Sequence, residues 1–200
     1  MADAGIRLHK DNEIAWLVLN RPEKKNALDK SMWASIPSLV QEAVSNPGIK
    51  ILIVRSENPG FFSAGADIGE FSLFMADRNA RNDNRQAIKE ACRALENCPL
   101  PTVAMIQGPC VGGGCILALT CDIRFGDEKS KYGITPAKLG LVYGLADTRR
   151  LVDLVGPSQA KQILFTAGIF SSHRALRIGL VNDIFPDDKL EEETEKWLRR

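Results

Sequence analysis

The sequence predicts a single α/β domain in which strands and helices alternate along the chain. Two observations predict this class. Short apolar runs have the length of buried strands, and segments with helical caps or helical spacing lie between them, as in folds with crossover connections. A chain of 200 residues is long enough to bury one core, so we expect one domain over residues 1–200.

The predicted strands are apolar runs bounded by polar or turn-forming residues. The first two flank the polar turn at 11–13 and should form a hairpin. The third, at 49–56, should be fully buried. In chain order, we expect strands at 6–10, 14–19, 49–56, 101–108 and 123–127.

The predicted helices lie between these strands and dominate the C-terminal third. Asp29 is a good N-cap, so a helix should follow it, and Pro37 should kink this helix or mark its true start. A mobile polar stretch at 78–85 should lead into the next helix, which ends near Cys98. In chain order, we expect helices from 30 to about 45, up to about 98, and over 112–122, 147–154, 158–166, 172–178 and 187–198.

Composition and charge argue against several classes of function. A formal net charge of +1 gives no reason to expect nucleic acid or a membrane surface as a partner. No apolar run reaches the roughly 18 residues of a membrane span, and the N-terminus has no apolar signal region, so we expect a cytoplasmic protein. The five cysteines and two histidines show no ligand spacing, so we expect reduced thiols and no metal.

Two small-residue loops stand out as a pair. FFSAGADI, at 61–68, follows a buried strand and places Asp67 to cap a helix, and CVGGGCI, at 110–116, likewise follows a strand and opens a helix. Each loop offers a free backbone N–H at a strand-to-helix junction. Two such amides aimed at one point form an oxyanion hole, which stabilises charge developing on a carbonyl oxygen. Either loop alone is equally well explained as a tight turn, but the pair favours a site.

Four motifs carry a resemblance to a known family, in order and over nearly the whole chain. They are NRPEKKNAL at 20–28, FSAGADI at 62–68, GPCVGGGCILALTCDIR at 108–124 and ALRIGLVN at 175–182. In these motifs the chain resembles the crotonase, or enoyl-CoA hydratase/isomerase, superfamily. The resemblance implies a spiral of ββα turns and an acyl-CoA thioester substrate. It also implies that the amides of Ala66 and Gly113 hold the thioester oxygen. Coenzyme A is then part of the substrate, and we expect no separate cofactor.

The same resemblance implies further contacts with the substrate. Lys24 or Lys25 would lie near the nucleotide, although a solvated loop charge explains either lysine equally well. The CoA side of the pocket would be lined by Ala64, Ala66, Asp67, Ile68 and Gly69.

The hydratases of this family use two glutamates to handle water, and this chain matches neither. One lies two residues after the last glycine of the triplet, where this chain has Ile116, and the other aligns with Pro136. Neither side chain can move a proton, and general acid–base catalysis contributes about 10²–10⁴-fold per group. The isomerases need at least the second glutamate, and the dehalogenase-like members use an aspartate where this chain has Gly144. The usual hydratase mechanism is therefore not expected.

Because both glutamates are replaced, we favour a decarboxylase-like lyase reaction. The segment at 134–145 resembles the methylmalonyl-CoA decarboxylase branch, which has a tyrosine at the place of Tyr143. That branch has a histidine where this chain has Ala66, so the resemblance is partial. Decarboxylation needs no base for carbon–carbon cleavage, and an apolar wall such as Ile116 avoids solvating the initial carboxylate. Tyr143 can donate to a carboxylate or orient a water, although a core or subunit-facing tyrosine is an equal interpretation.

Two other functions stay open. A hydratase or isomerase can recruit another carboxylate, such as Asp147 or Glu70, and a CoA-thioester-binding protein needs no catalytic group. Asp122 and Asp147 are more simply explained as a strand-end residue and a helix N-cap.

Family members usually continue into C-terminal helices that help to form a trimer, whereas this sequence stops at Arg200, so we expect those helices to be absent from it. With those helices, we expect a homotrimer or a dimer of trimers.

Overall fold

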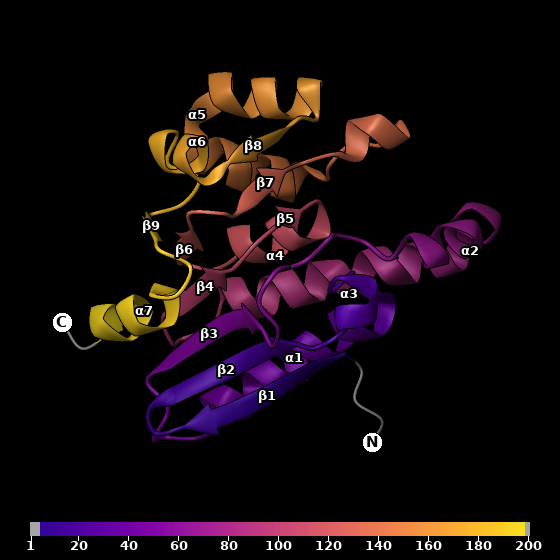
Figure 1. The fold of residues 1–200 in the computed structure, drawn as a ribbon. Coiled ribbons are helices and arrows are strands. Elements are labelled where there is room, and N and C mark those ends of the chain that lie inside the picture. The colour runs from indigo at the N-terminus through magenta and orange to yellow at the C-terminus, as the bar shows by residue number, and fades with distance from the viewer. Residues whose placement is uncertain (1–4, 199–200) are drawn as a thin grey trace.

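The computed structural model describes residues 5–198 and confirms the α/β class (Figure 1). The main sheet is ordered β1 (Ile6–Asp11), β2 (Ile14–Leu19), β3 (Ile51–Ser56), β4 (Thr102–Ile106), β6 (Ile123–Asp127) and β9 (Asp183–Phe185). β1 and β2 form the predicted antiparallel hairpin, and every other pair of neighbours is parallel. Parallel neighbours require crossover connections, which the intervening segments supply.

A second, three-stranded sheet was not predicted. Its order is β5 (Cys110–Val111), β7 (Lys131–Gly133) and β8 (Ile169–Ser171). Strands of two or three residues are too short to show an alternating pattern, so only their pairing in space reveals them. β5 follows the strand β4 of the main sheet and therefore carries the chain from one sheet to the other.

Helices cover both faces of the main sheet. α1 (Lys30–Val44) and α3 (Arg78–Glu96) pack together on the face that includes Leu17 and Leu19. α7 (Leu190–Leu198) covers the opposite face, where Leu190 packs with Trp16 and Val18 (Figure 1). Because alternate residues of each central strand are buried on opposite faces, these strands consist of continuous apolar runs.

The start of α1 confirms the predicted cap. Asp29 Oδ1 accepts a hydrogen bond of 2.9 Å from the N–H of Met32. The helix begins at Lys30 and runs through Pro37, so the alternative that Pro37 marks its start was wrong. Proline lacks an N–H, so this helix runs on without the hydrogen bond that residue 37 would otherwise donate.

The prediction of a mobile stretch at 78–85 was wrong. α3 begins at Arg78, after the short helix α2 (Phe71–Ala76), and Asp77 caps it by accepting from the N–H groups of Asn79 and Ala80 at 2.7 and 3.3 Å. The polar residues of its first half mostly face solvent, while four buried side chains further along anchor the helix: Ala87, Ala91, Cys92 and Leu95. A solvated helical face and a polar loop have similar composition, which explains the error.

The later helices follow the prediction with shifted limits. They are α4 (Gly113–Leu119), α5 (Leu145–Thr166) and α6 (Ser172–Arg177). The helices predicted at 147–154 and 158–166 are two helical stretches within α5, and they are separated by a kink at Gly156, where φ is 73°. No helix within residues 5–198 is long and apolar enough to cross a membrane.

Candidate active site

The two small-residue loops meet at one edge of the main sheet. They follow β3 and β4, which are parallel neighbours, so both loops leave the sheet at the same edge. Backbone hydrogen bonds then join them. The N–H of Ser63 donates to the carbonyl of Pro109 at 3.1 Å, and the N–H of Val111 donates to that of Ser63 at 3.0 Å.

The amide of Ala66 points toward the glycine turn. Leu28 pairs with Ala66 in a parallel bridge, in which it donates to the Gly65 carbonyl at 2.7 Å and accepts from the Asp67 N–H at 3.1 Å. Leu28 therefore bonds to the residues on either side of Ala66, and the N–H of Ala66 itself faces the other way. A Cβ placed on Gly113 would lie 3.3 Å from the nitrogen of Ala66.

The amide of Gly113 opens α4. The first N–H groups of a helix have no partner within that helix. Gly112 donates to the Gly133 carbonyl at 2.8 Å, and Ile116 makes the first bond of the helix by donating to the Gly112 carbonyl at 3.1 Å. The N–H groups of Gly113, Gly114 and Cys115 precede that first bond. Over residues 5–198, the N–H groups of Ala66 and Gly113 donate to no acceptor inside the protein. Two adjacent free donors of this kind can bind an oxyanion.

The close approach of the two loops explains why small residues line it. A Cβ on Gly114 would lie only 2.7 Å from Cβ of Ser63. Gly65 has a φ of +103°, and a Cβ there would lie 2.9 Å from the Val111 carbonyl oxygen. Both contacts are shorter than ordinary van der Waals distances, so the loops can touch only through glycine.

Gly114→Ala should therefore destabilise the protein. We expect the free energy of unfolding to fall by about 1–3 kcal/mol, because the added methyl group must push Ser63 out of a packed position. Gly168→Ala is the matched control, since its nearest neighbour would be Thr166 Oγ1 at 3.6 Å. Urea denaturation measures both variants, and equal destabilisation would contradict the packing argument.

The first loop presents its predicted substrate-facing residues in alternation. Ala64, Ala66 and Ile68 are exposed, whereas Gly65 and Asp67 are buried. Ile68 and Gly69 begin the short 3-10 helix η2 (Ile68–Glu70), and both are exposed. Ala64, Ala66, Ile68 and Gly69 are thus accessible to a ligand, while the side chain of Asp67 turns into the protein.

Asp67 caps η2, as predicted. Its Oδ1 accepts a hydrogen bond of 2.8 Å from the N–H of Gly69, and its Oδ2 lies 2.7 Å from Nη1 of Arg21. The Gly69 N–H and the Arg21 guanidinium lower the pKa of this carboxyl despite its burial, so Asp67 is ionised at neutral pH.

The two lysines lie beside this loop. Lys24 ends the 3-10 helix η1 (Pro22–Lys24), and both Lys24 and Lys25 are exposed. The Nζ of Lys25 lies 5.0 Å from the centroid of the Phe61 ring. The backbone carbonyl of Lys25 accepts a hydrogen bond of 2.9 Å from the N–H of Ala64. The loop that carries the lysines is therefore tied to the first site loop.

Tyr143 bonds to the glycine turn. Its hydroxyl donates to the carbonyl of Gly112 at 2.7 Å, and burial raises the pKa of this tyrosine well above its usual range. Gly112 directly precedes Gly113, so Tyr143 holds the turn that presents the second amide. We predicted that the Tyr143 hydroxyl donates to a carboxylate or orients a water. In the structure it donates to the backbone carbonyl of Gly112.

The two positions that the sequence analysis aligned with the hydratase glutamates carry apolar side chains. Ile116 lies in α4 and is 9% exposed, within the main core. Pro136 opens the 3-10 helix η3 (Pro136–Leu139) and is half-buried. After η3 begins, a run of apolar side chains is exposed: Leu139, Leu141, Val142 and Leu145.

The candidate replacement bases are held by other groups. Asp147 is not the N-cap of α5, because Gly144 occupies that position. Asp147 Oδ1 lies 2.6 Å from Nη1 of Arg150, which also pairs with Glu96, and burial raises the pKa of Asp147. Placed inside the first turn, Asp147 bonds to a side chain rather than to the backbone N–H groups that an N-cap satisfies.

Glu70 and Asp122 also have structural partners. Glu70 accepts from the N–H of Lys30 at 3.0 Å, and burial raises the pKa of its carboxyl. Asp122 accepts from the N–H and hydroxyl of Thr102 at 2.8 and 2.7 Å, which confirms its interpretation as a strand-end residue.

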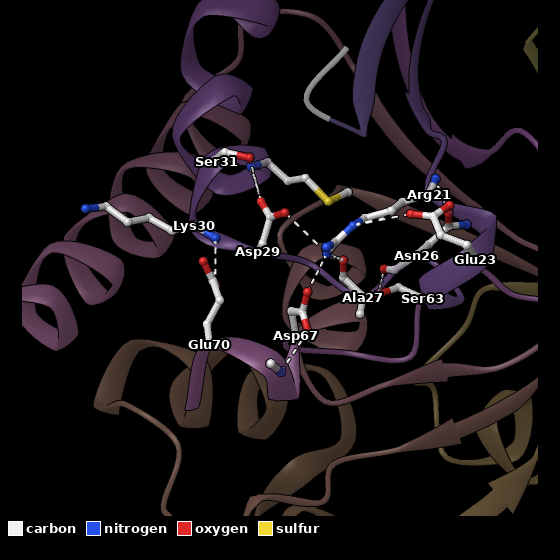
Figure 2. A network of polar contacts seen from close by, with 12 residues as sticks. Arg21, Glu23, Asn26, Ala27, Asp29, Lys30, Ser31, Ser63, Asp67 and Glu70 are labelled. Carbon is white, nitrogen blue, oxygen red and sulfur yellow. Dashed lines mark hydrogen bonds and ion pairs between the residues drawn. The ribbon is translucent and has the colours of Figure 1, made fainter. Parts of the chain in front are cut away.

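Sequence analysis missed Arg21, which lies at the centre of the polar network in Figure 2. Its Nη1 is 2.7 Å from Asp67 Oδ2 and 3.2 Å from Asp29 Oδ2. Nothing in the sequence showed that Asp29 and Asp67 share this arginine, because Asp67 lies far from Arg21 along the chain.

The site contains no evident metal centre among residues 5–198, where no group of three or more His, Cys, Asp or Glu side chains could hold a metal ion. The predicted absence of a metal rests on the sequence.

Comparisons with known proteins point to one family. The family model described as enoyl-CoA hydratase/isomerase matches residues 9–200. Crotonyl-CoA hydratase of Syntrophomonas wolfei is 36% identical over 196 residues, which cover 98% of this chain and 75% of that protein. The peroxisomal Delta(3,5)-Delta(2,4)-dienoyl-CoA isomerase of Arabidopsis thaliana is 32% identical over 190 residues, with 90% and 68% covered. A crystal structure from Hyphomonas neptunium, assigned to the same family, superposes with a TM-score of 0.94 at 44% identity and covers 97% of this chain and 74% of that one.

Proposed function

This chain belongs to the enoyl-CoA hydratase/isomerase family, and from this premise we propose that it is an enzyme that binds an acyl-CoA thioester at Ala66 and Gly113. One observation carries the proposal. Their backbone N–H groups lie side by side and are free, within the described part of the chain, for an outside acceptor. They hold the thioester oxygen while the substrate becomes an enolate, because preorganised donors stabilise charge as it develops. Coenzyme A belongs to the substrate, and the proposal requires no further cofactor.

For the reaction, we propose decarboxylase-like lyase chemistry. Ile116 and Pro136 offer no group that moves a proton at the positions where the family's hydratases use glutamate. In decarboxylation, the bond between the α-carbon and the substrate's carboxylate breaks, carbon dioxide leaves, and the electron pair passes to the thioester as an enolate. Water then protonates the α-carbon. The two amides favour the enolate, and the buried side chain of Ile116 disfavours a solvated carboxylate.

A second candidate is a hydratase or isomerase that uses Asp147 or Glu70. Burial raises the pKa of both carboxyl groups, as is typical of acid–base residues. Both are also engaged, Asp147 by Arg150 and Glu70 by the Lys30 N–H, which weighs against this candidate. A non-catalytic acyl-CoA-binding protein is the third.

A panel of CoA thioesters tests these candidates. It contains enoyl-, 3-hydroxyacyl-, malonyl- and methylmalonyl-type thioesters, with products identified by mass spectrometry. We expect loss of carbon dioxide from a malonyl- or methylmalonyl-type substrate. Hydration that disappears in Asp147→Asn or Glu70→Gln would support the second candidate, and binding without turnover of any thioester would support the third.

The same premise leads us to propose a cytoplasmic homo-oligomer. A trimer or a dimer of trimers is the expected assembly of a chain that has the family's C-terminal helices, because closed symmetry is the usual outcome.

A further inference from the structure

The guanidinium of Arg21 connects several carboxyl and carbonyl groups near the candidate site (Figure 2). Its Nη1 lies 2.7 Å from Asp67 Oδ2, lies 3.2 Å from Asp29 Oδ2, and donates to the Ala27 carbonyl at 3.1 Å. The side chains of Arg21 and Asp67 are only 21% and 9% exposed. Charge-assisted contacts with so little access to water are stronger than exposed ion pairs.

On one side, this network fixes the loop of the first amide. Asp67 directly follows Ala66. Its Oδ2 pairs with Arg21, its Oδ1 accepts from the Gly69 N–H, and its own N–H donates to the Leu28 carbonyl. The Ala66 N–H cannot rotate away from the site without disturbing these contacts.

On the other side, the network reaches the second amide through α1. Asp29 Oδ2 pairs with Arg21, while its Oδ1 caps α1 through the Met32 N–H. The next residue of that helix, Trp33, is buried beside the glycine turn, and its Cζ2 would lie 3.5 Å from a Cβ on Gly113. Arg21 thus contacts a residue next to the first amide and the cap of the helix that packs against the second.

We propose that Arg21 is a positioning residue that, through Asp67 and Asp29, sets the direction of the Ala66 N–H relative to the Gly113 N–H. The inference rests on the proposed function, since it concerns the same pair of amides. Arg21 acts on the loops that carry the two donors and not on a reacting atom. Its effect is on how well the two donors converge on the thioester oxygen.

Lysine should replace Arg21 only in part. An ammonium group is a compact point charge, whereas the guanidinium is a planar fork with five donors. Arg21→Lys keeps the charge that Asp67 and Asp29 require. All three contacts are made by Nη1, and the ammonium of lysine stands on a shorter side chain than this nitrogen, so it should reach only some of the three acceptors. Arg21→Gln removes the charge altogether.

The test uses an arylacryloyl-CoA thioester, a conjugated probe whose absorption moves to longer wavelength as its carbonyl is polarised. The wild-type protein should bind it with a red shift. Arg21→Gln should bind it but lose most of that shift, and Arg21→Lys should lose part of it. For the thioester that the panel shows to be turned over, kcat of Arg21→Gln should fall by about tenfold to a hundredfold with KM changed less than about twofold, as expected for misplaced catalytic geometry.

Glu23→Gln is the matched control. Glu23 Oε1 lies 3.7 Å from Nε of the same arginine, but its side chain is 66% exposed. We expect this variant to keep the red shift and kcat of the wild type. Asp67→Asn should lose part of the red shift and of kcat, because it removes the pair of Arg21 with Asp67 and leaves the pair with Asp29. The double variant should lose no more than Arg21→Gln alone, because Arg21→Gln already removes the pair with Asp67.

The possible outcomes separate this inference from the proposed function. A folded Arg21→Gln protein with the wild-type red shift and kcat would overturn the role of Arg21 alone. A wild-type complex that binds the probe with no red shift would overturn the oxyanion pair and this inference with it. If Arg21→Gln does not fold, as judged by near-ultraviolet circular dichroism, Arg21→Lys and Asp67→Asn decide the question by the same measurements.

Discussion

Gly113→Pro is expected to reduce kcat by about 10²–10³-fold, which is the usual effect of losing one oxyanion donor. Gly113 is the first residue of α4, a position at which proline is well tolerated in helices. The substitution removes the N–H of that residue without removing a hydrogen bond inside the helix. The fold should therefore survive while the site loses one of its two donors.

Gly113→Ala is the matched control for this variant. It keeps the N–H, although its Cβ would lie 3.3 Å from the Ala66 nitrogen and 3.5 Å from Trp33 Cζ2, so its neighbours must move slightly. We expect a smaller loss of kcat than for proline. Steady-state kinetics on the thioester that the panel identifies, with circular dichroism as a check on folding, measures both. A folded Gly113→Pro protein with unchanged kcat would show that this amide is not the second donor.

Hydration of crotonyl-CoA by the unmodified protein is expected to be slower than that of an efficient hydratase by several orders of magnitude. The proposed function has Ile116 and Pro136 in place of two proton-transfer groups. Each such group is worth about 10²–10⁴-fold, and two groups that act together are not additive. The decisive measurement is kcat/KM for crotonyl-CoA. A value above about 10⁶ M⁻¹s⁻¹, within the range of efficient enzymes, would show that Ile116 and Pro136 are not the relevant positions or that another carboxylate replaces them.

Ile116→Glu alone should not restore hydration. Ile116 is 9% exposed within the core, so burial would raise the pKa of a glutamate there, and its partner across the water would still be missing. Ile116→Glu combined with Pro136→Glu should restore weak hydration. The control is the double variant Ile116→Gln with Pro136→Glu, because glutamine at 116 has nearly the size of glutamate but no carboxyl group. Equal activity of the two double variants would contradict a role for the carboxylate at 116.

Local signals in the sequence were sufficient for much of the fold. The hairpin of β1 and β2, the caps Asp29 and Asp67, and the helix after the glycine triplet were predicted correctly. Each depends on residues within a few positions of one another, such as a side-chain oxygen and an N–H two or three residues later. Alternation also predicted crossover connections, whereas the order of the strands, and with it the edge at which the two loops meet, comes from the structure.

Other features depend on which distant segments come into contact. The first half of α3 was not recognised, because its polar residues are explained only by the side that the fold buries. The strand β8 is recognisable only through its antiparallel pairing with β7. No local pattern in the sequence specifies the register of that pairing.

The sequence by itself determined that this chain is an α/β protein with two loops of small residues, each between a strand and a helix, and it predicted that Ile116 and Pro136 replace two glutamates. Only the tertiary structure decided how those loops are held. Leu28 pairs on either side of Ala66, Tyr143 donates to Gly112, and Arg21 joins Asp29 to Asp67. The physical reason is that the direction of an N–H group and the partner of a charge depend on contacts between residues far apart in the chain. Composition and spacing do not specify these contacts, which form only when the sheet brings those residues together.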